Sequence, residues 1–470
     1  MEESAPAAPS SSRGTWIAVA AFVIGIAIGA AGVFGGQLLF PPAVEAEIPI
    51  IGSVVAVTGA LEIFGPTIRL GIDLARDEIN AAGGVLGQDI VTIHEDSGSV
   101  PAVSITAASK LINVDGVQAI IGALASDASL PVTQGVTTPG RVVQMSPAST
   151  SVALTFFNEG LSLEDRFFFR TAPTDLLQGA AAGVYAFETK GWRDVAILAR
   201  ADPYGSGLAQ KFQDTFEGLG GTITARVDYD ITATVFDTEL ATVFNSGLEA
   251  LWWVPFPLEG ELILSQWLAA TGANPDWLLP EWLWAEGVRS STFVDTVVGL
   301  GIPVQGMEGT APLTSLAASD NLAIFNTAFA AANPDAVLQL FEPQSYDSMY
   351  LIALAMQMGG GVDSETIRAN LRAVSSPPGT IITPGNWSLA LTEIAAGNDI
   401  NYEGASGFVN FDAFGDVGSD YEVWTINETG KIVHKLRILE SDIPSPVSPS
   451  YVPAARLVSG WMPQAAVTRD

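Results

Sequence analysis

The chain has 470 residues, of which 48% are hydrophobic and 15% charged, so it is long enough for two or three structural units with sizeable cores. Its 51 acidic and 20 basic residues give a net charge of −31, which argues against a nucleic-acid partner because phosphate binding needs a basic stripe. The absence of cysteine excludes disulfides, thiolate metal sites and cysteine nucleophiles. With only two histidines, His94 and His434, most zinc sites and Ser-His-Asp triads are also excluded.

The N-terminal segment has the composition of a membrane span. No charged residue occurs between Arg13 and Glu45, and Trp16 to Phe40 is almost entirely apolar. This length suits a transmembrane helix, whereas the apolar core of a signal peptide is usually shorter. We therefore expect a retained anchor over 16–40 after a short tail, 1–15. The alternative is a removed signal segment, for which residues 44–46 offer a cleavage pattern. In either case the bulk of the chain lies outside the cytoplasm, and with the anchor the protein is single-pass in the cell membrane.

Strand and helix patterns alternate from Ile48 onward. In the first run a buried strand over 50–57 leads into a helix over 66–82, which has a proline in its first turn and a Gly-Gly pair at its end. The run continues with a strand (90–95), a helix (103–112) and a strand (117–121). Such alternation predicts a parallel sheet covered by helices.

The same rhythm restarts after Asp175, which predicts a second unit of similar build. The expected elements are helices over 177–189, 207–219, 238–245 and 261–271 and strands over 194–199, 223–229 and 250–254. A late helix (345–358) and late strands (408–411, 422–426) close the fold. We therefore expect two Rossmann-like lobes, with a pocket in the cleft beyond the carboxyl ends of their strands.

The expected boundaries follow from this pattern. They are a tail (1–15), an anchor (16–40), a linker (41–47), lobe 1 (48–172 and 308–395), lobe 2 (173–307 and 396–441) and a Pro- and Ser-rich tail (442–470). The sequence contains no phosphate-binding loop, no G-x-S-x-G elbow, no H-E-x-x-H and no dinucleotide fingerprint after the first strand. We therefore expect a binding protein and not an enzyme, without a metal or organic cofactor.

Small polar residues follow the predicted strands at the edge where a cleft would lie. Ser126 comes after the strand that starts at Val117, and Thr150 ends the run Ser146-Pro147-Ala148-Ser149-Thr150. A hydroxyl together with backbone amides at a strand-to-helix junction suits an anionic group. The alternative is that both residues are helix caps.

Glu281 stands in the apolar run Pro280-Glu281-Trp282-Leu283-Trp284. A buried carboxylate there needs a cation or a raised pKa. Few basic residues are nearby, Arg289 being the nearest, so we favour a ligand cation over a protein cation as its partner.

From Ile48 to about Ile438 the chain resembles the leucine/isoleucine/valine-binding proteins, which are type I periplasmic binding proteins of the Venus-flytrap kind. The markers are the stretches Gly65-Pro66, Asp77 to Gly87, Ile120-Ile121-Gly122, Ser146 to Thr150, Tyr204 to Gly207 and Tyr346-Asp347-Ser348. Each is weak alone, but their order and spacing together are specific.

The resemblance implies a ligand-binding role for eight residues. In this family the ligand carboxylate is held at positions matching Ser126 and Thr150. The ammonium is held by the carbonyl at Ala148, the Thr150 hydroxyl and a glutamate matching Glu281. The expected pocket walls are Phe64, Tyr204, Phe256 and Tyr346. Phe256 stands where branched-chain binders tend to have tyrosine, next to the bulky Trp252-Trp253, so the size of the pocket is open.

The resemblance implies an extracytoplasmic protein whose lobes close on a small amino acid, branched-chain or related, and deliver it to an ABC permease. A rival within the same fold binds amides, urea-like solutes or aromatic carboxylates. A rival from another class is the ligand-binding domain of a membrane sensor, although residues 1–15 are too few for an output domain.

Overall fold

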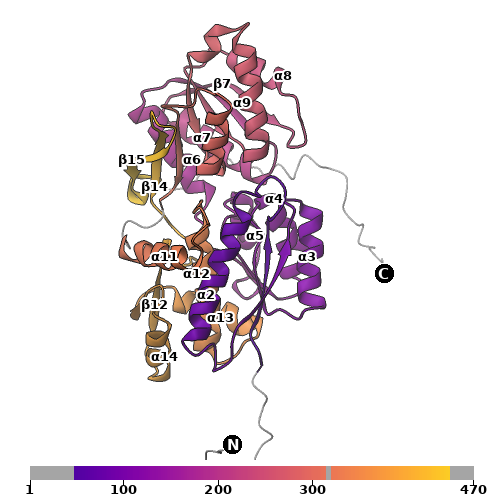
Figure 1. The fold of residues 1–470 in the computed structure, drawn as a ribbon, viewed down its shortest axis with the longest axis vertical. Coiled ribbons are helices and arrows are strands. Elements are labelled where there is room, and N and C mark those ends of the chain that lie inside the picture. The colour runs from indigo at the N-terminus through magenta and orange to yellow at the C-terminus, as the bar shows by residue number, and fades with distance from the viewer. Residues whose placement is uncertain (1–46, 314–318, 445–470) are drawn as a thin grey trace, which may run out of the picture. The chain divides into compact units, whose positions relative to one another are not determined.

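The computed structural model describes residues 47–313 and 319–444, which form two α/β lobes (Figure 1). The first lobe is built on a parallel sheet in the order β2-β1-β3-β4-β5. Its early elements are β1 (Ile50–Val55), α2 (Gly65–Ala81), β2 (Val91–Asp96), α3 (Pro101–Asn113), β3 (Ala119–Gly122), α4 (Ser126–Val132), β4 (Val143–Ser146), α5 (Val152–Glu159) and β5 (Phe168–Arg170). The β1, β3 and β4 strands are buried over almost their whole length because helices cover both faces of the sheet.

Late segments of the chain return to the first lobe, where Figure 1 shows α12 beside α2. These elements are α11 (Ser319–Ala332), α12 (Glu342–Gly359), α13 (Ser364–Val374), β11 (Thr380–Ile382), α14 (Trp387–Ala395), β12 (Ile400–Gly404) and β13 (Gly407–Phe408). The three short strands form a small sheet of their own. The α12 helix is buried over nearly its whole length, and this includes the polar side chains of its first two turns as well as the apolar run that follows them.

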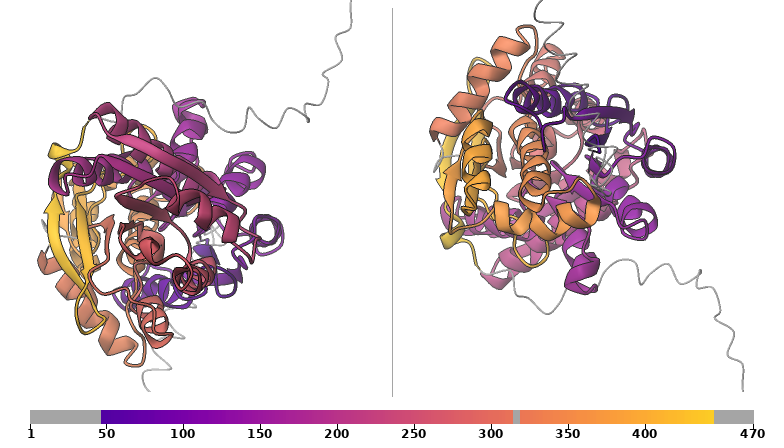
Figure 2. Two further views of the ribbon diagram at one scale, coloured as in Figure 1. Left: turned by 90° about the horizontal axis from the view of Figure 1, so that it is seen from above. Right: turned by 90° about the horizontal axis from the view of Figure 1, so that it is seen from below.

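The second lobe has a seven-stranded sheet in the order β15-β14-β10-β9-β8-β6-β7. Its elements are α6 (Asp175–Val184), β6 (Asp194–Arg200), α7 (Pro203–Gly218), β7 (Thr222–Tyr229), α8 (Asp237–Phe244), β8 (Ala250–Val254), α9 (Pro257–Thr271), β9 (Glu281–Trp284), α10 (Ser291–Gly299), β10 (Glu308–Pro312), β14 (Tyr421–Ile426) and β15 (Ile432–Ile438). Only β14 and β15 run antiparallel to their neighbours. Figure 2 shows these two strands, in yellow, at one edge of the lobe.

Strand pairing places two segments in the other lobe than the sequence predicts. Residues 308–312, expected in lobe 1, form β10, which pairs with β9 and β14 in the second sheet. Residues 400–408, expected in lobe 2, form β12 and β13 beside β11 in lobe 1. The order of elements along the chain does not reveal which sheet a short strand joins, because that depends on partners far away in sequence.

The two-lobed α/β architecture is confirmed. The predicted anchor at 16–40 lies outside the described residues, as does most of the predicted C-terminal tail. Within 47–313 and 319–444, no helix is both long and apolar enough to cross a membrane.

Candidate ligand-binding site

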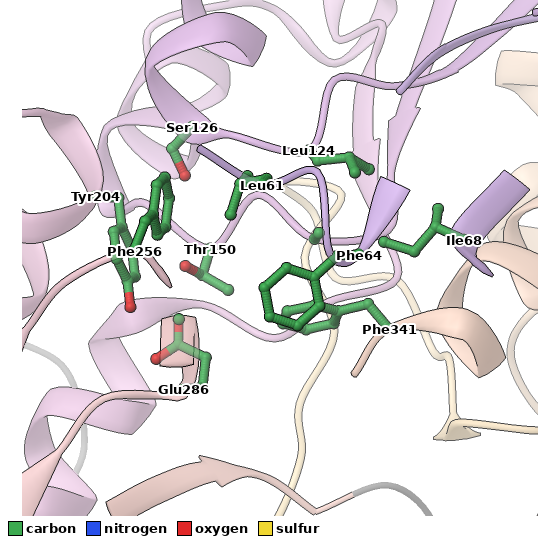
Figure 3. Close-up of a pocket in the computed structure, with 12 residues that line it drawn as sticks. Leu61, Phe64, Ile68, Leu124, Ser126, Thr150, Tyr204, Phe256, Glu286 and Phe341 are labelled. Carbon is green, nitrogen blue, oxygen red and sulfur yellow. The ribbon is translucent and has the colours of Figure 1, made fainter. Parts of the chain in front are cut away.

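A small cavity, with a volume of about 30 Å³, lies where strands of both lobes end. It is lined by Leu61, Phe64, Ile68, Leu124, Ser126, Ala148, Thr150, Tyr204, Phe256, Glu286, Gly287 and Phe341. Figure 3 shows that the polar groups of Ser126, Thr150, Tyr204 and Glu286 gather on one side. The apolar side chains of Leu61, Phe64, Leu124 and Phe341 lie on the other side. The cavity therefore has a polar half and an apolar half.

The first lobe contributes Ser126, Ala148 and Thr150, and both hydroxyl-bearing residues are buried. Ser126 is the first residue of α4, whose cap is Ala125, and Thr150 precedes Ser151, the residue that caps α5. Neither hydroxyl therefore serves as a helix cap, the alternative that the sequence left open. The Ser126 Oγ accepts a hydrogen bond from the Ser151 amide at 3.2 Å, which joins the two polar loops.

The second lobe contributes an aromatic wall. The rings of Tyr204 and Phe256 stack with centroids 5.2 Å apart, and the Arg200 guanidinium lies 3.6 Å from the centre of the Phe256 ring. Arg200 is itself held by Asp202 and Glu259, both buried. A Glu259 carboxylate oxygen also accepts a hydrogen bond from the Phe256 amide at 2.8 Å. This ion cluster holds the aromatic wall in a defined position.

The apolar half comes entirely from the first lobe. Leu61 and Phe64 lie in the turn before α2, and Ile68 lies in the first turns of that helix. Leu124 follows β3, and Phe341 precedes α12 with a positive φ of 79°. This half suits a small aliphatic or aromatic group.

Glu281 is not in this cavity. It is the first residue of β9 and pairs with Ala250 at the start of β8, so it lies at the edge of the sheet opposite the cleft. Its side chain is 56% exposed and is bonded to Lys190 and, at 3.3 Å, to the Trp192 Nε1. The apolar run around Glu281 is the strand itself, and a strand's amino end can reach solvent even where its centre is buried. The prediction of a ligand cation there is wrong, because a protein cation is its partner.

The carboxylate in the cavity is Glu286, which the sequence reasoning missed. It follows the carboxyl end of β9 by two residues and is buried. Gln178 Nε2 donates to its Oε2 at 2.5 Å. The signal was available, since a pocket in a parallel sheet draws its residues from the carboxyl ends of strands.

Burial controls the electrostatics at Glu286. Loss of hydration raises the pKa of Glu286 to about 7. Asp175, the first residue of α6, is also fully buried, and its pKa lies well above its ordinary value because of burial and the nearby Glu286 charge. A ligand cation at this position would relieve the cost of burying negative charge.

Tyr346 also lies outside the cavity. Its hydroxyl donates to the Glu78 carboxylate and accepts from the Gly385 amide at 2.9 Å, and its ring stacks on Tyr350. It belongs to the buried core of the first lobe. The structure thus brings together Phe64, Ser126, Ala148, Thr150, Tyr204 and Phe256, and it adds Leu61, Ile68, Leu124, Glu286, Gly287 and Phe341.

Comparisons with known proteins agree with this architecture. Residues 50–390 match the family described as periplasmic binding protein. The leucine-, isoleucine-, valine-, threonine- and alanine-binding protein of Pseudomonas aeruginosa is 27% identical over 317 residues, which cover 67% of this chain and 80% of that protein. Leu/Ile/Val-binding protein homolog 1 of Brucella suis is 29% identical over 242 residues, or 52% of this chain and 61% of the relative.

Solved structures share the fold. The leucine-binding protein LivK of Thermotoga maritima superposes with a TM-score of 0.69 at 23% identity, covering 84% of this chain and all of that one. LivJ of Streptococcus pneumoniae in complex with isoleucine gives 0.67 at 22% identity, covering 84% and 99%. A solute-binding protein of R. palustris in complex with benzoate gives 0.66 at 16% identity, covering 84% and 96%. The chain therefore belongs to the periplasmic binding protein family, and its resemblance to the leucine/isoleucine/valine-binding proteins is confirmed.

Proposed function

We propose that the protein is an extracytoplasmic solute-binding protein that captures a small amino acid with an aliphatic side chain and delivers it to an ABC importer. The observation that carries the proposal is the buried Glu286 carboxyl, which lines the cavity together with Ser126 and Thr150. The names of the relatives, which bind leucine, isoleucine or valine, point to the same class of ligand.

The division of the cavity matches the parts of such a ligand. The ammonium would pair with Glu286, because a buried carboxyl without a cation is costly. The carboxylate would accept hydrogen bonds from the Ser126 and Thr150 hydroxyls. The aliphatic side chain would occupy the half lined by Leu61, Phe64 and the neighbouring apolar residues.

Ligand binding would bridge the lobes, since Ser126 and Thr150 belong to one lobe and Glu286 to the other. Contacts made only when the lobes are together favour the closed form, and that form would dock on the permease. We further propose that 16–40 anchors the protein in the cell membrane. Its uncharged composition supports this, and tethering would raise the local concentration at the importer.

An aromatic carboxylate is the second candidate ligand. The stacked Tyr204 and Phe256 rings offer a flat surface for an aromatic ring. A protonated Glu286, with its pKa raised to about 7, could donate a hydrogen bond to a carboxylate that carries no ammonium. In this case Glu286 acts as a neutral donor and not as a counter-ion.

Titration calorimetry at pH 6 and at pH 8 separates the candidates, with leucine, isoleucine, valine, alanine, benzoate and 4-hydroxybenzoate as ligands. The lower pH is needed because benzoate, if it binds through protonated Glu286, should bind at pH 6 and weaken above the pKa of about 7. Amino acids should bind, and Glu286→Gln should weaken them about tenfold to a hundredfold because the ammonium loses its counter-charge. Glu281→Gln is the matched control and should leave affinity unchanged, since this exposed carboxylate pairs with Lys190. Tight binding of benzoate without binding of any amino acid would refute the first proposal and support the second.

A further inference from the structure

The loop after β4, residues Ser146 to Ser151, carries the cavity residues Ala148 and Thr150. Its backbone carbonyls accept hydrogen bonds from donors of a neighbouring segment. The Arg170 Nη1 donates to the carbonyls of Ser149 and Ser151, at 3.1 and 3.0 Å, on either side of Thr150. The Thr150 carbonyl accepts from the Asp175 amide at 2.9 Å. Three successive carbonyls of this loop therefore take donors from the stretch 170–175, where the chain leaves the first lobe for the second.

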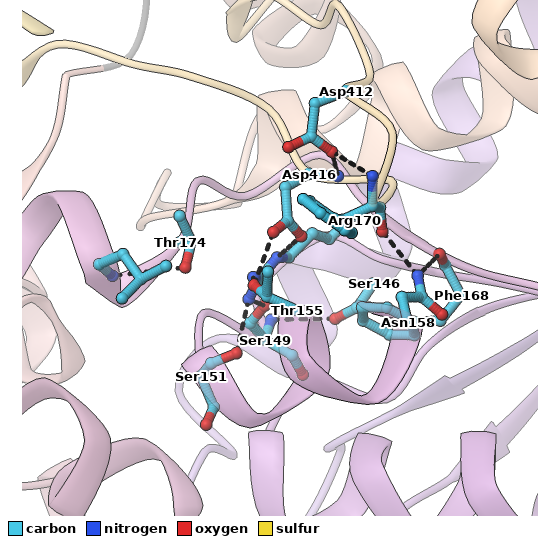
Figure 4. Close-up of polar contacts among 12 residues, drawn as sticks. Ser146, Ser149, Ser151, Thr155, Asn158, Phe168, Arg170, Thr174, Asp412 and Asp416 are labelled. Carbon is cyan, nitrogen blue, oxygen red and sulfur yellow. Dashed lines mark hydrogen bonds and ion pairs between the residues drawn. The ribbon is translucent and has the colours of Figure 1, made fainter. Parts of the chain in front are cut away.

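Arg170 is fully buried at the end of β5, and its Nε and Nη2 atoms also donate hydrogen bonds (Figure 4). Its Nε donates to the Asp416 Oδ1 and its Nη2 to the Thr155 Oγ1, both at 2.6 Å. The Thr155 hydroxyl in turn donates to the Asp416 Oδ2 at 2.6 Å. A planar guanidinium with fixed donor directions suits this arrangement, whereas an ammonium cannot reach all four acceptors.

Asp416 belongs to the segment between β13 and β14, along which the chain crosses from the first lobe to the second. This segment is folded tightly, because the Asp412 carboxylate accepts from the amides of Phe414 and Asp416 at 2.7 and 3.0 Å. The Arg170 amide also donates to the Gly415 carbonyl at 3.0 Å. Arg170 thus connects the cavity loop to a crossing segment by both its backbone and its side chain.

We infer that Arg170, held by Asp416 and Thr155, is a positioning residue for ligand binding: it fixes the backbone on both sides of Thr150 and ties that loop to the crossing between the lobes. It does not touch the cavity itself, and it acts through Thr150. The inference rests on the proposed function only in taking Thr150 as a ligand contact.

The first test compares Arg170→Lys with Arg166→Lys by titration with L-leucine. Arg166 contacts the same crossing segment, through the Ala413 carbonyl at 2.6 Å, but donates to no carbonyl of the loop. Arg170→Lys should raise Kd about tenfold or more, and Arg166→Lys should leave it within about twofold. Equal losses in both variants would overturn the positioning role.

Thr155 provides a second pair of variants in case Arg170→Lys does not fold. Thr155→Val removes the hydroxyl that joins Arg170 to Asp416, and Thr155→Ser keeps it. Thr155→Val should weaken binding severalfold, while Thr155→Ser should bind like the wild type. Equal behaviour of the two variants would contradict the inference.

A double-mutant cycle tests whether Arg170 acts through Thr150. If it does, Arg170→Lys should cost much less affinity in a Thr150→Ala background than in the wild type, whereas a general loss of stability would give additive effects. Hydrogen exchange of the ligand-free protein adds a readout that needs no ligand. Amides of residues 148–151 should exchange faster in Arg170→Lys but not in Arg166→Lys, and unchanged exchange would overturn the inference. If the wild type binds no amino acid, the proposed function is refuted. The hydrogen-exchange comparison still tests the role of Arg170 in that case, because it needs no ligand.

Discussion

Glu286 is buried in the cavity with a pKa raised to about 7, so its charge depends on pH in the neutral range. If the ligand ammonium pairs with the carboxylate, protons compete with the ligand below this pKa. We predict that affinity for leucine falls from pH 8 to pH 6 and that binding near pH 7 releases a proton. Calorimetry in buffers of different ionisation enthalpy measures both. In Glu286→Gln the dependence on this group should vanish, and its persistence would mean that another residue titrates.

In the ligand-free protein the raised pKa of Glu286 also makes stability depend on pH. Acid should increase stability, whereas it should decrease affinity. A carboxyl whose pKa is raised on folding binds its proton more tightly in the folded state. Its contribution to stability is therefore fully present below its ordinary pKa near 4.5 and is lost as the pH rises through about 7. We predict that Glu286→Gln raises Tm at pH 8 more than at pH 5. A larger gain at pH 5 would contradict this assignment.

The two glutamates of this region show what a sequence can say about single residues. Both Glu281 and Glu286 border the apolar run Trp282 to Trp284, so composition does not separate them. Strand direction does, because Glu281 precedes β9 and Glu286 follows it. The first-lobe residues Ser126 and Thr150 line the cavity, and their positions after strands within distinctive motifs made them candidates; their role in ligand binding stays a prediction. Tyr346 was misplaced because a helix buried on every face gives no sign of which side faces the cleft.

Strands made of a continuous apolar run could be predicted from the sequence. Strands without such a run, which form only because they pair with other strands, could not. The bounds of β8 were predicted at both ends, since Ala250 to Val254 is apolar and Pro255 follows it. β10, with the sequence Glu-Gly-Thr-Ala-Pro, has no apolar run and becomes a strand by pairing with β9 and β14. Such a strand depends on partners that are remote in sequence, and local pattern cannot reveal it.

The contact between α2 and α12 depends on Gly71. A Cβ at this position would lie 2.4 Å from the Ser345 Oγ and 2.8 Å from the Glu342 carbonyl oxygen, so the helices would have to separate. We predict that Gly71→Ala lowers the free energy of unfolding by about 1–3 kcal/mol, measured by chemical denaturation. Gly218→Ala, in helix α7, is the control. No atom lies within 4 Å of its added Cβ, so stability should stay equal or rise slightly.

At the level of the whole binding unit, two polar contacts near the cavity join the lobes. The Ser151 Oγ donates to the Pro203 carbonyl at 2.6 Å, and the Thr150 carbonyl accepts from the Asp175 amide. Both contacts involve the loop that Arg170 holds. The loop that lines the cavity therefore also makes the contact between the lobes, so under the proposed function we expect ligand binding to affect the relative position of the lobes.

Asp127 gives the lobe contact its own dependence on pH. It lies half-buried in α4 of the first lobe, near Asp202 and Arg200 of the second lobe. Its pKa is raised to about 6, first by burial and then by the Asp202 charge, with Arg200 opposing the shift. Separating the lobes would hydrate Asp127 and return its pKa toward 3.8, so we expect closure of the lobes to take up a proton. Its contribution to closure is present below 3.8 and is lost as the pH rises through about 6.

We therefore predict that Asp127→Asn, neutral at every pH, tightens leucine binding severalfold at pH 8 and makes the ligand-free protein more compact in small-angle scattering. Asp89→Asn changes the net charge equally at an exposed position in the first lobe and should alter neither property. The two titrating groups act in opposite directions on affinity, because acid neutralises the Glu286 counter-charge but favours closure at Asp127. In Glu286→Gln, affinity should consequently rise on acidification from pH 8 to pH 5, and adding Asp127→Asn should flatten that rise. A rise that persists in the double variant would place the proton uptake at another group of the lobe contact.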